Sequence, residues 1–233
     1  MKVLALNQIG IDNFCVASVS EGIELRKGGV CGEILILGYT HPECFPLLIK
    51  YNLVQTVVNY HYAELLNAYG KPVKVHIKID TGMHRLGIDC KDILKVKEVF
   101  NMKNINVCGI FTHLCCADSL RHEDVLFTRE QINNFFSLID DLKDSGITIP
   151  KLHIQSSYGL LNYPDIKCDY VRAGIALYGC LSSPNDDTLL KLDLRPVLSL
   201  KSKVVLIREI KKGDSIGYGR CFTAERNSLI AIL

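Results

Sequence analysis

The feature that most constrains the fold of this chain is a regular alternation of short β-branched runs with helical patterns. Seven runs are predicted to form strands: residues 14–19, 33–37, 54–58, 73–79, 105–114, 151–157 and 170–179. Helical patterns lie between them at about 61–69, 91–101 and 127–144, and a further helix is expected to begin at Ser20. Strands that alternate with helices over short connections favour parallel βαβ units.

Seven parallel strands are one fewer than the eight of a closed (β/α)8 barrel of the TIM type. The first residues, MKVLALNQIGID, are typical of the end of a helix with Gly10 as its C-terminal stop, and no strand precedes them. We therefore predict an α/β barrel of this type that lacks its first strand, over residues 1–195. From residue 196 the chain changes to alternating strands, VLSLKSKVVLIREI and SLIAIL, with the turn KKGDS between them. Residues 196–233 are predicted to be the start of a β-rich C-terminal domain.

Composition narrows the class of protein further. The chain is 48% hydrophobic and 22% charged, which is typical of a globular protein with a substantial core. A formal net charge of +2 gives no reason to expect a nucleic acid or an anionic membrane as partner. No apolar run approaches the roughly 18 residues that a membrane helix needs. The ten cysteines include no C-x-x-C pair, so neither a metal site nor a disulfide framework is predicted, and a cytoplasmic setting is favoured.

Polar residues gather where a barrel of this type carries its chemistry, at the C-terminal ends of the strands. In KVHIKIDTGMHRLGID, residues 74–89, Val75, Ile77 and Ile79 alternate with Lys74, His76 and Lys78, so Lys78 is expected to face the barrel interior. Four strand ends carry such groups: Lys78 and Arg85, then His113, then Ser156 and Ser157, then Arg172 with Gly174 and Ile175. This concentration predicts a working site rather than surface decoration.

These segments resemble a known family. IKIDTGMHRLGI resembles the signature of the pyridoxal-phosphate-dependent alanine racemases, in which a strand is followed by D-T-G-M-x-R-x-G. FTHLCCAD resembles the next strand of that family, YVRAGIALYG its R-x-G-I-x-x-Y-G segment, and GDSIGYGRCFTA its catalytic tyrosine loop. The agreement runs in order along essentially the whole chain. HLCCADSL and VRAGIALYG also resemble the racemase domains of vancomycin-resistance serine/alanine racemases.

The resemblance implies catalytic roles for four residues. Arg85 resembles the arginine that contacts the substrate carboxylate, a role that suits its planar, permanently charged fork. Lys78 resembles a lysine that is carbamylated in many members, although an ordinary salt-bridged lysine fits its position equally well. Tyr218 resembles the general base that removes the Cα hydrogen of the L-enantiomer, and His113 the histidine that packs against the cofactor and links the tyrosine to an arginine. In the family this tyrosine comes from the partner subunit, which implies a homodimer.

Further residues resemble the family's contacts to pyridoxal 5'-phosphate. Arg172 matches the arginine that faces the pyridine nitrogen. An arginine donates a hydrogen bond to that nitrogen but accepts no proton from it, so the ring is a weaker electron sink and racemisation is favoured over transamination. Ser157, Gly174 and Ile175 resemble the phosphate cradle, with His113 beside the ring. In LHIQSSYGLLNYP, Ser156 stands where the family has an asparagine.

The resemblance implies an amino-acid racemase that interconverts L- and D-alanine, or the enantiomers of serine, through a pyridoxal phosphate aldimine and two bases. Its product would supply D-amino acid for peptidoglycan. The family's Schiff-base lysine follows the first strand in a K-x-x-A-Y-G-H-G-like segment, which does not occur here, since NAYGKPVK resembles it only superficially. This chain alone is therefore expected to be inactive. The alternative is a catalytically inactive barrel that only binds the cofactor, whereas a decarboxylase is disfavoured by Arg172.

Overall fold

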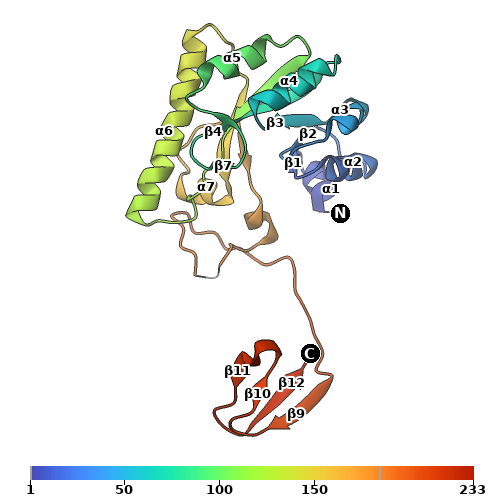
Figure 1. Ribbon diagram of the computed structural model, residues 1–233, viewed down its shortest axis with the longest axis vertical. Coiled ribbons are helices and arrows are strands. Elements are labelled where there is room, and N and C mark those ends of the chain that lie inside the picture. The colour runs from blue at the N-terminus through green and yellow to red at the C-terminus, as the bar shows by residue number, and fades with distance from the viewer. Residues whose placement is uncertain (1, 184) are drawn as a thin grey trace. The chain divides into compact units, whose positions relative to one another are not determined.

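Parallel strands and the helices between them build the first part of the molecule (Figure 1). The computed structural model describes residues 2–183 and 185–233. Within it the chain divides into two units, Met1–Arg195 and Pro196–Leu233.

The sheet of the first unit consists of parallel strands that pair in the order β1-β2-β3-β4-β6-β7-β8. Their bounds are β1 (Asn13–Val16), β2 (Glu33–Ile36), β3 (Val54–Val57), β4 (Val73–Asp80), β6 (Ile105–Phe111), β7 (Lys151–Ser156) and β8 (Tyr170–Arg172), and the short β5 (Ile88–Asp89) pairs with β4. The seven runs predicted from sequence each overlap one of these strands, which confirms the barrel-type fold. The last run was predicted too long: β8 ends at Arg172, and a 3-10 turn, η2 (Ile175–Tyr178), follows it.

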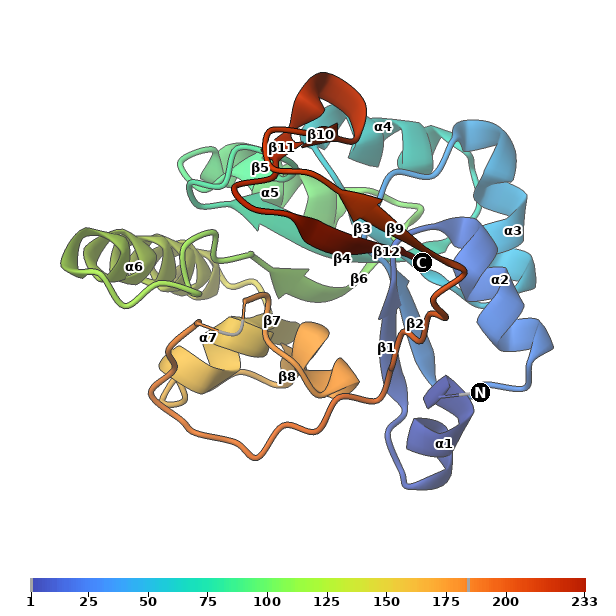
Figure 2. The ribbon, with the colours of Figure 1, turned by 90° about the horizontal axis from the view of Figure 1, so that it is seen from below.

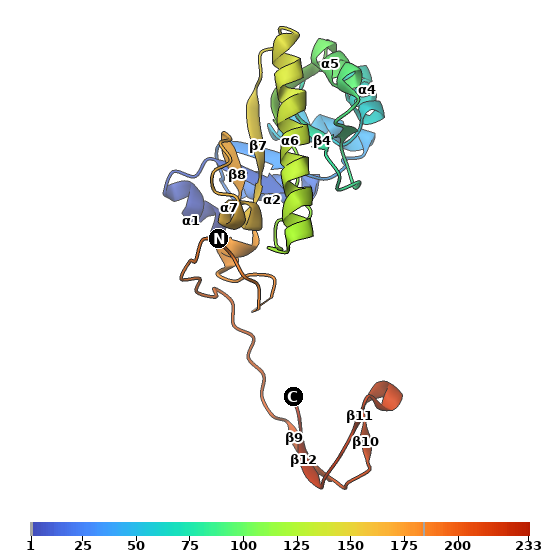
Figure 3. The ribbon, with the colours of Figure 1, turned by 90° about the vertical axis from the view of Figure 1, so that its left-hand side faces the viewer.

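The helices alternate with the strands along the chain, starting with one before β1, and they lie outside the curve of the sheet (Figure 2). They are α1 (Lys2–Gln8), α2 (Val19–Lys27), α3 (Phe45–Lys50, preceded by the 3-10 turn η1, Pro42–Cys44), α4 (Tyr60–Ala68), α5 (Ile93–Asn101), α6 (His122–Asp144) and α7 (Ser157–Asn162). Helix α2 begins one residue before the predicted Ser20, because Ser18 and Glu21 form a capping box. The 23-residue α6 begins five residues earlier than predicted and runs along the outside of the unit (Figure 3). None of the helices that the structure describes is long and apolar enough to cross a membrane.

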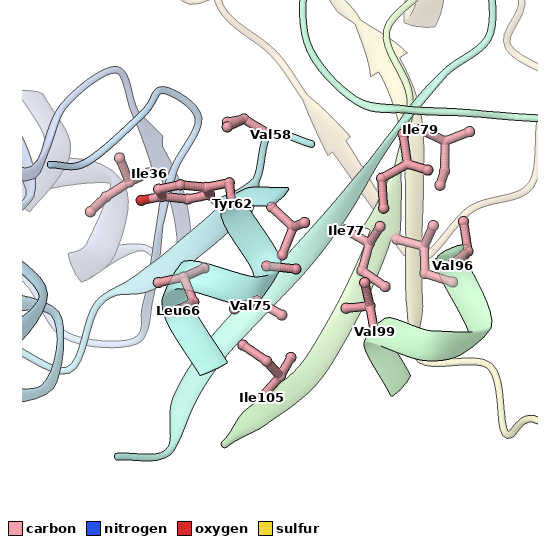
Figure 4. Close-up of a cluster of buried hydrophobic side chains, with 14 of the residues drawn as sticks. Ile36, Val58, Tyr62, Leu66, Val75, Ile77, Ile79, Val96, Val99 and Ile105 are labelled. Atoms are coloured by element: carbon pink, nitrogen blue, oxygen red, sulfur yellow. The ribbon is translucent and has the colours of Figure 1, made fainter. Parts of the chain in front are cut away.

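The two faces of β4 have different environments. Val75, Ile77 and Ile79 are fully buried and pack toward the helices, with Tyr62 and Leu66 of α4 and Val96 and Val99 of α5 in the same cluster (Figure 4). The alternate residues, His76 and Lys78, are 1% and 4% exposed and belong to the opposite face, inside the curved sheet. The predicted inward direction of Lys78 agrees with this alternation, and the strand carries its side chain toward the C-terminal end of the barrel.

The second unit contains two short antiparallel pairs. Strand β9 (Leu206–Ile210) pairs with β12 (Ser228–Ile232), and β10 (Ser215–Ile216) pairs with β11 (Phe222–Thr223) around the 3-10 turn η3 (Tyr218–Arg220). The predicted long strand from residue 197 is wrong over 197–205, where the backbone forms no regular element. Strand β12 pairs only with residues 206–210. A strand is formed where a neighbouring strand satisfies its backbone N–H and C=O groups, so the strand begins at residue 206.

Candidate functional site

A cavity of about 510 Å³ lies at the C-terminal ends of the barrel strands. Seven of the eight residues to which the family resemblance assigns a role line it: Lys78, Arg85, His113, Ser157, Arg172, Gly174 and Ile175. The eighth, Tyr218, belongs to the second unit, where its side chain is fully exposed. Residues far apart in the chain thus meet at one end of one barrel, because parallel strands bring their C-terminal ends to the same edge.

Arg172 is held by acceptors on three sides. Its Nη1 donates to Nδ1 of His153 at 2.6 Å and to the carbonyl oxygen of the same residue at 3.2 Å. Its Nη2 donates to the carbonyl oxygens of Thr112 (2.7 Å) and Ile154 (2.9 Å) and lies 3.2 Å from Nδ1 of His113. Among the described residues, only its Nε–H is left without an acceptor. Burial lowers the pKa of Arg172 to about 10, so the guanidinium is still charged at neutral pH.

His113 presents a neutral ring to the cavity. Burial, together with the positive charges of Arg172, Lys78 and Arg85, lowers its pKa to about 4. A guanidinium can only donate, so Nδ1 of His113 is the acceptor in their contact and the ring proton resides on Nε2. His113 therefore offers the cavity an N–H donor without adding positive charge.

Lys78 is a buried amine close to two other positive charges, those of Arg85 and Arg172. It forms no hydrogen bond or ion pair with any part of the chain that the structure describes, and its Nζ lies 5.9 Å from the ring centroid of Phe111. Burial, with the nearby charges of Arg85 and Arg172, lowers its pKa to about 8. About a tenth of the amine is then neutral at pH 7. The alternative of a salt-bridged lysine finds no carboxylate partner among the described residues.

The loop after β4 explains why residues 80–87 combine acidic, basic and flexible residues. The Asp80 carboxylate accepts hydrogen bonds from the backbone N–H groups of Gly82 and His84, both at 3.0 Å, which closes the turn. Gly87 has φ +127, and a Cβ at this position would lie 2.6 Å from the backbone nitrogen of Asp80. This tight turn sends the exposed Arg85 to the cavity wall, where it has no hydrogen-bond partner among the described residues.

Ser157 and the turn after β8 form a polar corner of the cavity. The Ser157 hydroxyl accepts hydrogen bonds from the backbone N–H groups of Gly174 (2.9 Å) and Ala176 (3.3 Å). Its own O–H remains as a donor. A Cβ built on Gly174 would meet no atom within 4 Å, so the space beside this backbone is open. The corner fits a small group that accepts hydrogen bonds.

Sequence reasoning missed two contributors to the site, His153 and Phe111. Their rings stack in parallel, with centroids 4.6 Å apart and an interplanar angle of 8°. Cζ of Arg172 lies 5.1 Å from the Phe111 centroid, so one aromatic ring contacts both the histidine and the arginine. The alternation in KLHIQSS places His153 on the interior face of its strand, and this signal would have found it.

The fold and the cavity define a class of protein: a parallel α/β barrel with a cationic ligand site at the C-terminal end of its strands. The described residues contain no group of three or more histidine, cysteine, aspartate or glutamate side chains that could hold a metal ion. The two arginines of the cavity suit the recognition of an organic anion, because a guanidinium pairs well with carboxylate and phosphate groups.

Comparisons with known proteins specify the family. A model described as "Alanine racemase, N-terminal domain" matches residues 1–182, and "Alanine racemase, C-terminal domain" matches residues 197–233. The chain is 53% identical to an amino-acid racemase of Enterococcus faecalis, over 97% of this chain and 32% of the relative. It is 39% identical to a serine/alanine racemase of Enterococcus gallinarum, over 98% of this chain and 32% of the relative.

The fold agrees with these matches. The solved alanine racemase of Clostridium difficile 630 superposes with a TM-score of 0.82 at 34% identity, covering 99% of this chain and 61% of that one. The chain belongs to the alanine racemase family, and the resemblance of its motifs is thereby confirmed. It spans about a third of the length of the two Enterococcus relatives.

Proposed function

We propose that this chain is the cofactor-binding barrel, with part of the following β domain, of a racemase that interconverts the enantiomers of alanine or serine. The observation that carries the proposal is the placement of Arg172 in the cavity wall with one donor, Nε–H, left without an acceptor among the described residues. The family and the names of the relatives support this activity for the whole protein. Its product would serve peptidoglycan synthesis.

The residues present fit pyridoxal 5'-phosphate. The cavity volume of about 510 Å³ is in the range of small-molecule sites. Ser157, Gly174 and Ile175 form a corner with an available hydroxyl donor and open space for a phosphate, and Arg172 would face the ring nitrogen. His113 would lie beside the ring.

Arg172 determines which chemistry the site favours. Pyridoxal phosphate, when bound, withdraws electrons from the Cα of an amino acid and so stabilises negative charge there. A guanidinium with a pKa of about 10 donates a hydrogen bond and accepts no proton. Beside such a guanidinium the ring nitrogen would stay less positive than beside a carboxylate, which would favour return of a proton to Cα over other reactions.

The remaining polar residues bind the substrate and move protons. Arg85 has its full donor fork available for the substrate carboxylate. The neutral fraction of Lys78 can add to carbon dioxide, losing a proton to become a carbamate anion that would pair with Arg85. Tyr218 would act as a base once cationic neighbours lower its pKa, and in a homodimer the partner subunit would supply it.

The second candidate is a barrel that binds the cofactor without turnover. It is favoured by one observation, the lack of a K-x-x-A-Y-G-H-G-like segment in this sequence. We propose that this chain alone does not racemise alanine, because two-sided proton transfer needs a second base opposite the tyrosine. Adding pyridoxal phosphate and L-alanine should yield no D-alanine above the background of the free cofactor.

Binding of pyridoxine 5'-phosphate to this chain tests the proposal. This analogue has no aldehyde, so it forms no Schiff base with surface lysines, and calorimetry would report only the cavity. We expect saturable binding, and binding at least about tenfold weaker in Arg172→Lys, because one charge-assisted hydrogen bond is lost. Lys27→Ala, which removes an exposed lysine at the end of α2 outside the cavity, is the matched control. A folded parent chain that shows no saturable binding would contradict the proposal.

A further inference from the structure

Two buried histidines inside the barrel have no direct role in the proposed function, although one of them holds Arg172. His76 on β4 and His153 on β7 are each 1% exposed, and Nδ1 of His76 lies 2.8 Å from Nε2 of His153. Both face the interior of the curved sheet, beneath the cavity that Arg172 lines. Buried imidazoles in contact need a definite arrangement of protons, because each nitrogen must be either donor or acceptor.

Arg172 determines that arrangement. Its guanidinium only donates, so Nδ1 of His153 is an acceptor and the proton of that ring is on Nε2. Nε2–H of His153 then donates to Nδ1 of His76. With Nδ1 occupied as an acceptor, the single proton of His76 must be on Nε2. Each ring is neutral, and the donors all point away from the arginine.

Glu33 of β2 stands at the end of this series. Its Oε1 lies 3.3 Å from Nε2 of His76, within ion-pair distance, but the two atoms are not aligned as a hydrogen bond, and this buried nitrogen has no hydrogen-bond partner among the described residues. The contact with His76 lowers the pKa of Glu33 and the charge of Lys74 lowers it further, and together they outweigh burial. A carboxylate with 29% of its side chain exposed thus lies beside the last N–H of the series, where it is placed to accept that proton's hydrogen bond.

The surrounding backbone leaves the rings little freedom. A Cβ at Gly109 on β6 would lie 2.5 Å from Cε1 and Nδ1 of His76, so the absence of a side chain makes room for that ring. Phe111, on the same strand, stacks against His153. His76 therefore packs against bare backbone of β6, and His153 packs against an aromatic ring of the same strand.

We propose that Glu33, His76 and His153 form a hydrogen-bonded relay of fixed polarity that orients Arg172, with Glu33 as a positioning residue at its far end. Arg172 has no carboxylate in direct contact among the described residues, and the relay couples its positive charge to an anion across the barrel. Because the relay occupies Nη1, it leaves Nε–H for the cavity. Its bearing on catalysis rests on the proposed function, since there Nε–H meets the cofactor.

The proton arrangement is directly measurable in the full 233-residue chain without cofactor. Nitrogen-15 NMR of histidine-labelled protein distinguishes the two neutral tautomers and the charged ring. We expect His76 and His153 as neutral Nε2–H tautomers at pH 7. Glu33→Leu removes the acceptor and should give mixed tautomers at both rings, whereas Glu33→Gln keeps an acceptor oxygen and should restore the parent signals.

Glu64→Leu is the matched control, because Glu64 contacts the exposed His61 at 3.2 Å on the outside of the barrel. It should leave both buried tautomers unchanged. Binding of pyridoxine 5'-phosphate should weaken about tenfold in Glu33→Leu and less than about threefold in Glu33→Gln, in line with the loss of one buried hydrogen bond.

The outcomes separate the relay from the proposed function. If the parent chain shows a charged ring or an Nδ1–H tautomer at either residue, the relay is wrong, even if Glu33→Leu does not fold. The relay is equally wrong if Glu33→Gln behaves like Glu33→Leu. If the tautomers are as expected but no pyridoxine phosphate binds, the relay stands and the proposed function fails.

Discussion

At the scale of single residues, the site depends on imidazoles that stay neutral beside a fixed cation. His113 and His153 both accept a hydrogen bond from Arg172, and a protonated ring could not do so. Burial lowers the pKa of His153, and the charge of Arg172 lowers it further. The same interactions that orient the arginine therefore make the folded chain sensitive to acid.

The free energy of unfolding should fall as pH drops from about 6.5 to about 4. Over this range the unfolded chain binds a proton on His113, whose ordinary pKa is 6.5, while the folded chain resists it until about pH 4. His113→Asn keeps an acceptor for Arg172 but does not titrate. Between these pH values the free energy of unfolding of the parent should fall by on the order of 2 kcal/mol more than that of this variant. Urea unfolding followed by circular dichroism measures this difference. If the free energy of unfolding changed equally with pH in the parent and in the variant, the prediction would be refuted.

At the scale of elements, the pairing of β4 with β6 shows how a missing side chain positions a buried one. The register of the two strands shifts between Val75 and His76, so that His76 faces Gly109 rather than Cys108. Such an irregularity redirects a side chain locally. Here it places an imidazole against bare backbone in the barrel interior.

Gly109→Ala should therefore destabilise the barrel by about 1–3 kcal/mol, because its Cβ would overlap the ring of His76 and force repacking. Gly28→Ala is the control: its φ is −76 and its ψ is 0, and a Cβ there would come no closer than 3.4 Å to any atom. We expect that variant to remain within about 0.5 kcal/mol of the parent. Urea midpoints measure both, and two equally small changes would argue against the close packing at His76.

At the scale of the whole molecule, the chain consists of two units that differ in burial. The first contains the core cluster of strands and helices, whereas most residues of the second are exposed. Residues 197–205, which follow the boundary, form no regular element and include the exposed Lys201 and Lys203.

Limited trypsin digestion should cut first after Lys201 or Lys203, because exposed backbone without regular hydrogen bonding is the preferred substrate of proteases. Mass spectrometry should find a stable fragment that ends near residue 201 or 203. A Lys201→Gln, Lys203→Gln double variant should lose this early cleavage. Earlier cutting within α6 or β4 would show that the first unit is the less protected part.

Much of the fold could be predicted from local pattern. The seven strand runs and the helices at 61–69 and 91–101 follow from periodicity, which reflects the burial of one face. The short α3 and α7 were missed because six residues are too few for a clear helical period. The strand predicted over 170–179 was too long because apolar residues also suit the 3-10 turn η2.

The sequence by itself determined the order of strands and helices and the positions at strand ends where charged residues stand, because both depend on neighbours along the chain. Only the tertiary structure decided that Arg172 is held by His153, Thr112 and His113, and that His76 meets Glu33 and His153. These contacts join residues 19 to 77 positions apart, and their energetics depend on burial and on proton positions. Such properties arise only when the curved sheet brings the strands together.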